Sequence, residues 1–240
     1  MSDTSRMKAV LVAVGAVAFA ASPFMSGAFG GFRPDQFPVP QIDPPVQPAG
    51  YAFSIWGLIY LGLVAHGVFG LVARADDAGW DRGRWPLVIS LAVGAAWIPV
   101  AQVSAVWAAV LIWVMLVTAL MALAVAPRGA PWLGRVPLGL YAGWLTAAAW
   151  VSVALVAAGY GIGPGAVGWA WIALAAALVM AAAVLRLLGP ALDYAAPIAW
   201  ALVAITVQNW PEAPALATAA ASGAAVLLIY TMVILPRVKH

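Results

Sequence analysis

The stretch PLVISLAVGAAWIPVAQVSAVWAAVLIWVMLVTALMALAVA, residues 86–126, decides the fold of this chain, and it contains no charged residue. A helix needs about 20 apolar residues to cross a membrane, so the stretch is long enough for two crossings. Pro99 cannot continue the helical hydrogen-bond ladder, and Gln102 and Ser104 follow it closely. We therefore predict two helices, residues 86–102 and 104–126, that run in opposite directions and meet at a tight turn.

Further apolar runs flank this pair on both sides. They cover residues 7–30, 51–72, 136–158, 167–188, 191–208 and 213–235. The 240 residues are 65% hydrophobic and 8% charged, whereas a soluble domain is about 25% charged. A chain with so little charge could not cover its own surface in water. The sequence thus predicts an all-α integral membrane protein, a bundle of about eight transmembrane helices.

The basic residues favour eight crossings and set the orientation. With eight, ten of the 11 Lys and Arg residues fall on one side, and Arg33 alone falls on the other. Basic loops stay in the cytoplasm, so we expect a multi-pass protein of the cell membrane with both termini cytoplasmic. One crossing for residues 86–126 would scatter the charges over both sides. The ten residues are Arg6, Lys8, Arg74, Arg82, Arg84, Arg128, Arg135, Arg186, Arg237 and Lys239.

The first apolar run allows a second interpretation. Arg6 and Lys8, followed by an apolar run and the triplet AFA (residues 18–20), are typical of a cleaved signal peptide. The uncharged run continues to Phe32, however, and is longer than a usual signal core. We therefore expect this run to be retained as the first helix.

Residues 31–50 form the one long loop on the outer side, and six of them are proline. Proline fixes φ and lacks a backbone donor, so this loop is expected to be neither helix nor sheet. A long irregular loop in a compact protein is usually a functional cover or disordered. Because the prolines lower the entropy lost on ordering, we favour a semi-rigid cover. A plain spacer between helices is the alternative.

The chain offers few groups for catalysis or metal binding. It has no cysteine, two histidines, and no phosphate-binding loop, HExxH or nucleophile-elbow motif. We therefore expect neither an enzyme nor a metal site. His66 lies within a predicted crossing and could be a haem ligand, but an interhelical hydrogen bond is the favoured role. Arg186 and Asp193 flank the turn at residues 189–190, and we expect them to pair.

Aromatic side chains gather on two helical faces. The spacing i, i+3, i+7 places Phe53, Trp56 and Tyr60 on one face of their helix. The spacing i, i+4, i+8 places Trp144, Ala148 and Ser152 on one face of another. The residues expected in the outer half of the membrane, under the proline-rich loop, are Phe53, Trp56, Trp97, Trp107 and Trp150. Such rings could wall a cavity for a flat, apolar ligand. Ordinary helix packing and lipid-facing rings are the alternative.

Three motifs resemble the tryptophan-rich sensory protein family, also called the TspO/MBR or translocator protein family. The first motif, PAGYAFSIWGLIY (48–60), resembles the family's proline-rich first loop and the aromatic helix that follows. The second, AWIP (96–99), resembles the family's Trp-x-Pro. The third, YAGWLTAA (141–148), resembles the family's Tyr-x-x-Trp-x-Ser-x-Ala. The three occur in the family's order, within residues 1–159. The chain departs from the family in a shorter spacing between Phe53 and Trp56 and in Tyr51, which stands where the family has Trp.

The resemblance implies a five-helix membrane domain at residues 1–159, to which residues 160–240 add three transmembrane helices. Proteins of this family bind porphyrins, haem-related tetrapyrroles and, in some members, sterols, in a pocket covered by the first loop, with a sensory or transport role. Carried onto this sequence, the pocket residues are Phe53, Trp56, Tyr60, Trp97, Trp144 and Ala148, with Ser152 in the place of the family's Asn. Trp107 joins this candidate site by its depth alone.

These observations define the expected partners. We expect the protein to contact the lipid bilayer and to bind a small, flat, apolar ligand, but no nucleic acid. Porphyrin or haem would be such a ligand and not a required cofactor. A homodimer stays open. The alternatives are a small secondary transporter or permease that uses all eight helices, and a structural partner in a membrane assembly. Transporters commonly carry broken helices or buried charge at mid-membrane. In this sequence, Pro99 and Pro197 are the only candidates for a helix break, and His66 is the only candidate for a buried ionisable group.

Overall fold

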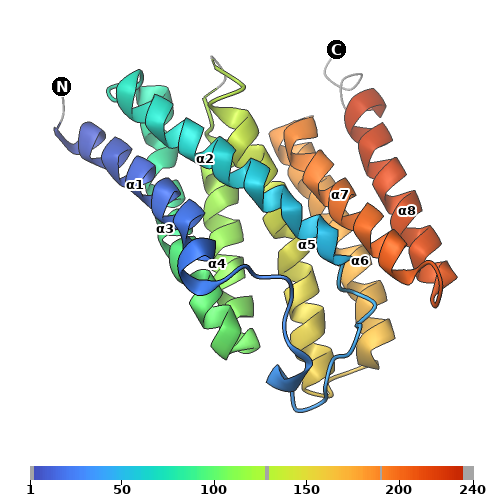
Figure 1. The fold of residues 1–240 in the computed structure, drawn as a ribbon. Helices are drawn as coiled ribbons and strands as arrows, with labels where there is room; N and C mark the ends of the chain where they lie inside the picture. Colours follow the sequence, from blue (N-terminus) through green and yellow to red (C-terminus); the bar gives the residue numbers. More distant parts are fainter. Residues whose placement is uncertain (1–2, 128–129, 190, 235–240) are drawn as a thin grey trace.

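The computed structural model describes residues 3–127, 130–189 and 191–234, and within them the chain is all-helical, without a strand (Figure 1). The α-helices are α1 (Asp3–Ser26), α2 (Ile55–Val72), α3 (Ala78–Val103), α4 (Ala105–Ala124), α5 (Arg135–Gly159), α6 (Gly165–Leu188), α7 (Leu192–Asn209) and α8 (Pro214–Ile229). Short 3-10 turns occupy Pro34–Gln36 and Gly50–Ser54, and α8 continues into a π turn at Tyr230–Ile234. Seven helices in the described part of the chain are long and apolar enough to cross a membrane.

The eighth helix, α7, has only 18 residues, so its polar ends count in its mean hydropathy. These ends contain Asp193, Gln208 and Asn209. Its 18 residues nevertheless extend about 27 Å at 1.5 Å per residue, close to the roughly 30 Å of a bilayer core. Asp193 lies beside Arg135 at the start of α5, and Asn209 bonds to the loop between α1 and α2. Thus α7 runs the length of the bundle, and its membrane crossing stays a prediction.

The predicted break after Pro99 is confirmed. α3 ends at Val103 and α4 begins at Ala105, and the Ser104 hydroxyl between them accepts a hydrogen bond from the Trp107 backbone N–H (3.3 Å). The predicted start of α3 was wrong, because the helix begins at residue 78 and not at residue 86. The Asp77 carboxylate caps it by accepting from the backbone N–H groups of residues 79 and 80.

Arg84 explains why the charged first turns of α3 belong to the helix. Its side chain is 3% exposed and donates to backbone carbonyls of Ser5 on α1, Gly70 on α2, and residues 74 and 75. Asp81, one turn earlier, pairs with Lys8 of α1 at 2.7 Å. These charges satisfy backbone groups at one end of the bundle, so α1, α2 and α3 are tied together there.

α5 is the most buried helix and packs against α4, α6 and α7. The Gly139-x-x-x-Gly143 notch gives α7 its close approach, because a Cβ at either glycine would collide with Asp193 or Tyr194. Small residues at membrane helix contacts allow such approach. A buried hydrogen bond of 2.9 Å between the hydroxyls of Thr146 and Tyr194 joins the two helices.

Figure 1 shows the start of α1 and the end of α8 at one end of the bundle, and the loop of residues 31–50 at the other. This arrangement agrees with an even number of crossings, while the cytoplasmic placement of the termini stays a prediction. Of the basic residues that predicted it, Arg128, Arg237 and Lys239 lie outside the described residues. Leu235, the predicted end of the last crossing, also lies outside them.

Candidate ligand-binding site

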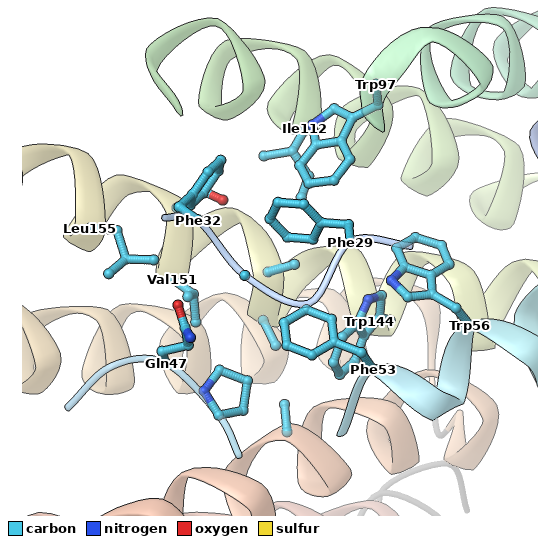
Figure 2. Close-up of a pocket in the computed structure, with 16 residues that line it drawn as sticks. Phe29, Phe32, Gln47, Phe53, Trp56, Trp97, Ile112, Trp144, Val151 and Leu155 are labelled. Carbon is cyan, nitrogen blue, oxygen red and sulfur yellow. The ribbon is translucent and has the colours of Figure 1, made fainter. Parts of the chain in front are cut away.

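Aromatic side chains enclose two adjoining hollows near the loop of residues 31–50, which we call the lid. The larger lobe, of about 410 Å³, lies between α1, α2, α3 and α4. The smaller lobe, of about 50 Å³, lies between the lid, α2, α4, α5 and α7 (Figure 2). Both are lined by Phe29, Phe53, Trp56, Trp97 and Ile112. Small-molecule pockets occupy about 300–1,000 Å³. The larger lobe falls in this range even without the smaller one.

The structure brings together seven of the predicted site residues. Phe53, Trp56 and Trp97 line both lobes, Tyr60 lines the larger, and Trp144, Ala148 and Ser152 line the smaller. Trp107 is 63% exposed and lines neither lobe. Its depth predicted the right height, but depth does not fix the direction of a side chain around the helix axis. Ile112 of the same helix faces the hollow instead, so we leave Trp107 out of the site.

The walls of the hollow are rings held by one another. Trp56 stacks on Tyr60 with ring centroids 5.2 Å apart, and the edge-on Trp56–Trp144 pair is separated by 6.2 Å. Phe19 of α1 meets Tyr60 edge-on at 5.0 Å. The Trp97 indole N–H donates to the Ala108 carbonyl oxygen at 2.9 Å, which fixes that ring. Rings arranged in this way form a preorganised apolar surface.

Phe29 stands between the two lobes, and the sequence prediction missed it. Its ring packs edge-on against Trp97 at 4.7 Å, Phe32 at 5.2 Å and Phe53 at 5.9 Å. We had placed residue 29 in the first helix, but α1 ends at residue 26 and Gly27 takes a φ of +84°. Phe29 therefore sits in the linker to the lid, and glycines at residues 27, 30 and 31 are the signal that could have revealed it.

The first half of the lid bonds to α3 and α5. The Gln36 side-chain amide donates to the Ala101 carbonyl oxygen at 2.8 Å, and the Val39 backbone N–H donates to the Gly159 carbonyl oxygen at 2.9 Å. Phe37 is buried directly over Gly159, where a Cβ would collide with its ring. This half of the lid is thus attached to the ends of two helices.

The second half of the lid and the turn that follows it bond to α7. The Asn209 amide donates to the Pro45 carbonyl oxygen at 2.8 Å, and the Ala49 backbone N–H donates to the Ala204 carbonyl oxygen at 3.2 Å. The Trp200 indole N–H donates to the Ala52 carbonyl oxygen at 3.0 Å. A helix outside the resembling residues 1–159 therefore holds the cover of the site.

His66 forms a hydrogen bond, but its partner lies in the turn before α5 and not in another helix. Its Nδ1 lies 2.8 Å from the carbonyl oxygen of Leu133, which precedes α5, and its ring stacks on Trp80 with centroids 4.7 Å apart. The side chain is 5% exposed and lines neither lobe. No group of three or more His, Asp or Glu among the described residues could hold a metal ion.

The expected pair of Arg186 and Asp193 was wrong. The Asp193 carboxylate lies 3.5 Å from Arg135 Nε, and Arg186 instead donates to the Tyr230 hydroxyl at 3.2 Å. Gly139 leaves the space that Asp193 fills, so α7 turns its carboxylate toward α5 and away from α6. Pro190, in the turn between α6 and α7, lies outside the described residues.

Comparison with known proteins gives one match. The model of a protein family described as TSPO-like protein matches residues 10–233. No curated protein and no solved structure matched the chain. The match runs through α6, α7 and α8, beyond the resembling residues 1–159, and the division into domains at residues 1–159 and 160–240 stays a prediction. With seven apolar helices of membrane-crossing length, this is a multi-pass membrane protein. The chain belongs to the family of TSPO-like proteins.

Proposed function

We propose that this protein binds a flat, largely apolar molecule of tetrapyrrole or sterol type in the two-lobed hollow under the lid, and that binding serves sensing or transport. The observation that carries the proposal is the ring-lined hollow itself, to which α1 to α5, α7 and the lid all contribute. The rings that line it are held by one another. The proposal treats the bound molecule as a ligand and not as a required cofactor.

The binding energy would come from burial and ring contacts. Apolar surface removed from water contributes about 25 cal/mol per Å², and an aromatic pair adds about 0.5–1.5 kcal/mol beyond its area. Trp97 and Trp144 are nearly buried and already fixed by neighbours. Because such rings lose little freedom on binding, most of this energy would appear as affinity.

A large flat ligand would also have to move Phe29. The smaller lobe alone, at about 50 Å³, is well below the size of a small-molecule site. Rotation of Phe29 away from Trp97 would join this lobe to the larger one. The linker at residues 27–31 contains three glycines, so it can adjust without moving the helices.

The proposal is tested by titrating the protein in lipid nanodiscs with protoporphyrin IX while Trp fluorescence is recorded. We expect saturable quenching beyond that of protein-free nanodiscs with added Trp. Trp144→Phe should weaken binding, whereas Trp107→Phe removes an equal ring outside the site and should leave the affinity unchanged. Quenching that matches the lipid control, or equal effects of both variants, would refute the proposed site.

Sensing and transport, including the permease alternative, differ in flux. The lid is attached to α3, α5 and α7, which favours a closed binding site. We therefore expect saturable binding without net movement of the ligand into proteoliposomes. Time-dependent uptake that exceeds the uptake by protein-free vesicles would instead establish a transporter.

A further inference from the structure

The hydrogen-bonding groups that line the hollow are all electrically neutral. The smaller lobe is lined by the Gln47 amide and the Ser152 hydroxyl, and by the indoles of Trp56 and Trp144. Ser152 is 4% and Trp144 3% exposed, and the side-chain hydrogen bonds found among the described residues include none of these four groups. They are free to bond to a ligand.

No charged side chain lines either lobe within the described part of the chain. Arg33 is the one basic residue of the lid, and its guanidinium is exposed and bonded to Asp35 at 3.1 Å. An ionised carboxylate that enters an apolar site without a charged partner loses far more solvation than neutral donors return. The hollow therefore offers a poor environment for an anion.

Gln47 and Trp56 lie at opposite ends of the smaller lobe. Figure 2 shows Gln47 on the side of Val151 and Leu155, while Trp56 lies on the other side. Gln47 reaches this place because Gly31, at a φ of +124°, has no Cβ, which would lie 2.8 Å from the amide nitrogen. The lid backbone is thus shaped to present an amide, which both donates and accepts hydrogen bonds.

Building on the proposed function, we propose that Gln47 and Ser152 determine specificity and that the site selects uncharged ligands. The ligand is a flat apolar molecule with a hydroxyl or carbonyl oxygen that bonds to Gln47 or Ser152. It is a sterol-like molecule or an esterified tetrapyrrole in preference to a tetrapyrrole dicarboxylate. The dicarboxylate binds more weakly because it would leave its charge unpaired next to neutral groups.

A matched pair of probes tests this selectivity. Protoporphyrin IX and its dimethyl ester share one ring system and differ in whether the two propionates are charged. Titration of the protein in nanodiscs, corrected with the partition coefficient of each probe into protein-free nanodiscs, should give an affinity at least about tenfold higher for the ester. Ser152→Ala should lower the ester affinity by about two- to tenfold, as expected for one lost hydrogen bond.

A substitution at Gln47 makes the test independent of partitioning. Gln47→Lys places a cation at the polar end and should shift the ratio of acid to ester affinities toward the acid by about tenfold or more. Gln47→Met, similar in length but uncharged, should not shift it. Equal or tighter binding of the acid by the unaltered protein, or an unchanged ratio in folded Gln47→Lys, would overturn the selectivity alone. Absence of binding by both probes would overturn the proposed function with it.

Discussion

At the scale of single residues, Phe29 controls access between the two lobes. Its ring is held by Trp97, Phe32 and Phe53, so a ligand that spans both lobes first breaks these contacts. Phe29→Ala removes that step, and we predict a several-fold faster association of protoporphyrin dimethyl ester in stopped-flow fluorescence. The cost is a cavity, which lowers the free energy of unfolding by about 1–3 kcal/mol because the ring is only partly buried.

The matched control for Phe29 lies five residues earlier in the chain. Phe24 is 91% exposed at the end of α1 and contacts neither lobe. Phe24→Ala should therefore leave the association rate unchanged. If both variants bind at the rate of the unaltered protein, Phe29 does not separate the lobes in solution.

Arg84 is the residue whose loss should cost the most stability. Its guanidinium bonds to carbonyl groups of α1, of α2 and of the link between α2 and α3 while 3% exposed. Arg84→Ala leaves several buried acceptors without donors, and we predict a loss of about 3 kcal/mol in the free energy of unfolding, measured by denaturation in detergent. Arg82→Ala, two positions away and exposed, should change it by less than about 0.5 kcal/mol. Equal effects would contradict the role given to Arg84.

At the scale of elements, α7 has two tasks, since it packs on α5 and holds the lid. Asn209 is 5% exposed and bonds to the Pro45 carbonyl oxygen. We predict that Asn209→Leu speeds hydrogen exchange at the Ala49 N–H, which bonds to α7 close by, and lowers the free energy of unfolding by about 1–2 kcal/mol. Gln208→Leu changes the exposed neighbour and should leave exchange at residue 49 as it is.

The helices differ in how much of them the sequence could predict. The break between α3 and α4 was predictable, because Pro99, Gln102 and Ser104 interrupt an apolar run. The true start of α3 was not, because an apolar-run criterion rejects charged turns, and the burial of Arg84 depends on carbonyl groups of α1 and α2 that are distant in sequence. In the same way, the spacing of Gly139 and Gly143 allows a close helix contact, but it does not name α7 as the partner.

The candidate site shows the same limit. Spacing placed Trp56 and Tyr60 on one face, and the stacked pair confirms it. Depth alone suggested Trp107, but its side chain is exposed and lines neither lobe. Phe29 and Gln47 line the hollow through irregular backbone, where no helical period constrains a side chain. A sequence pattern therefore predicts the part of a site that regular helices carry, and lid residues need the structure.

At the scale of the whole molecule, the orientation depends on whether α7 crosses the bilayer. Its two ends lie at opposite ends of the bundle, beside Arg135 and beside the lid. Its polar end residues Asp193 and Asn209 are both bonded or paired within the protein. A helix sheltered in this way can be less apolar than its neighbours and still span the membrane.

The chain contains no cysteine. A single introduced cysteine can therefore report topology, because no native thiol would be labelled. Ile42→Cys lies on the lid, Asp76→Cys between α2 and α3, and Glu212→Cys between α7 and α8, and all three positions are exposed. Because α7 ends beside the lid, we predict that a membrane-impermeant maleimide labels positions 42 and 212 in intact cells and position 76 only after permeabilisation. Labelling of position 42 without position 212 in intact cells would mean that α7 does not cross and that the bundle has seven spans.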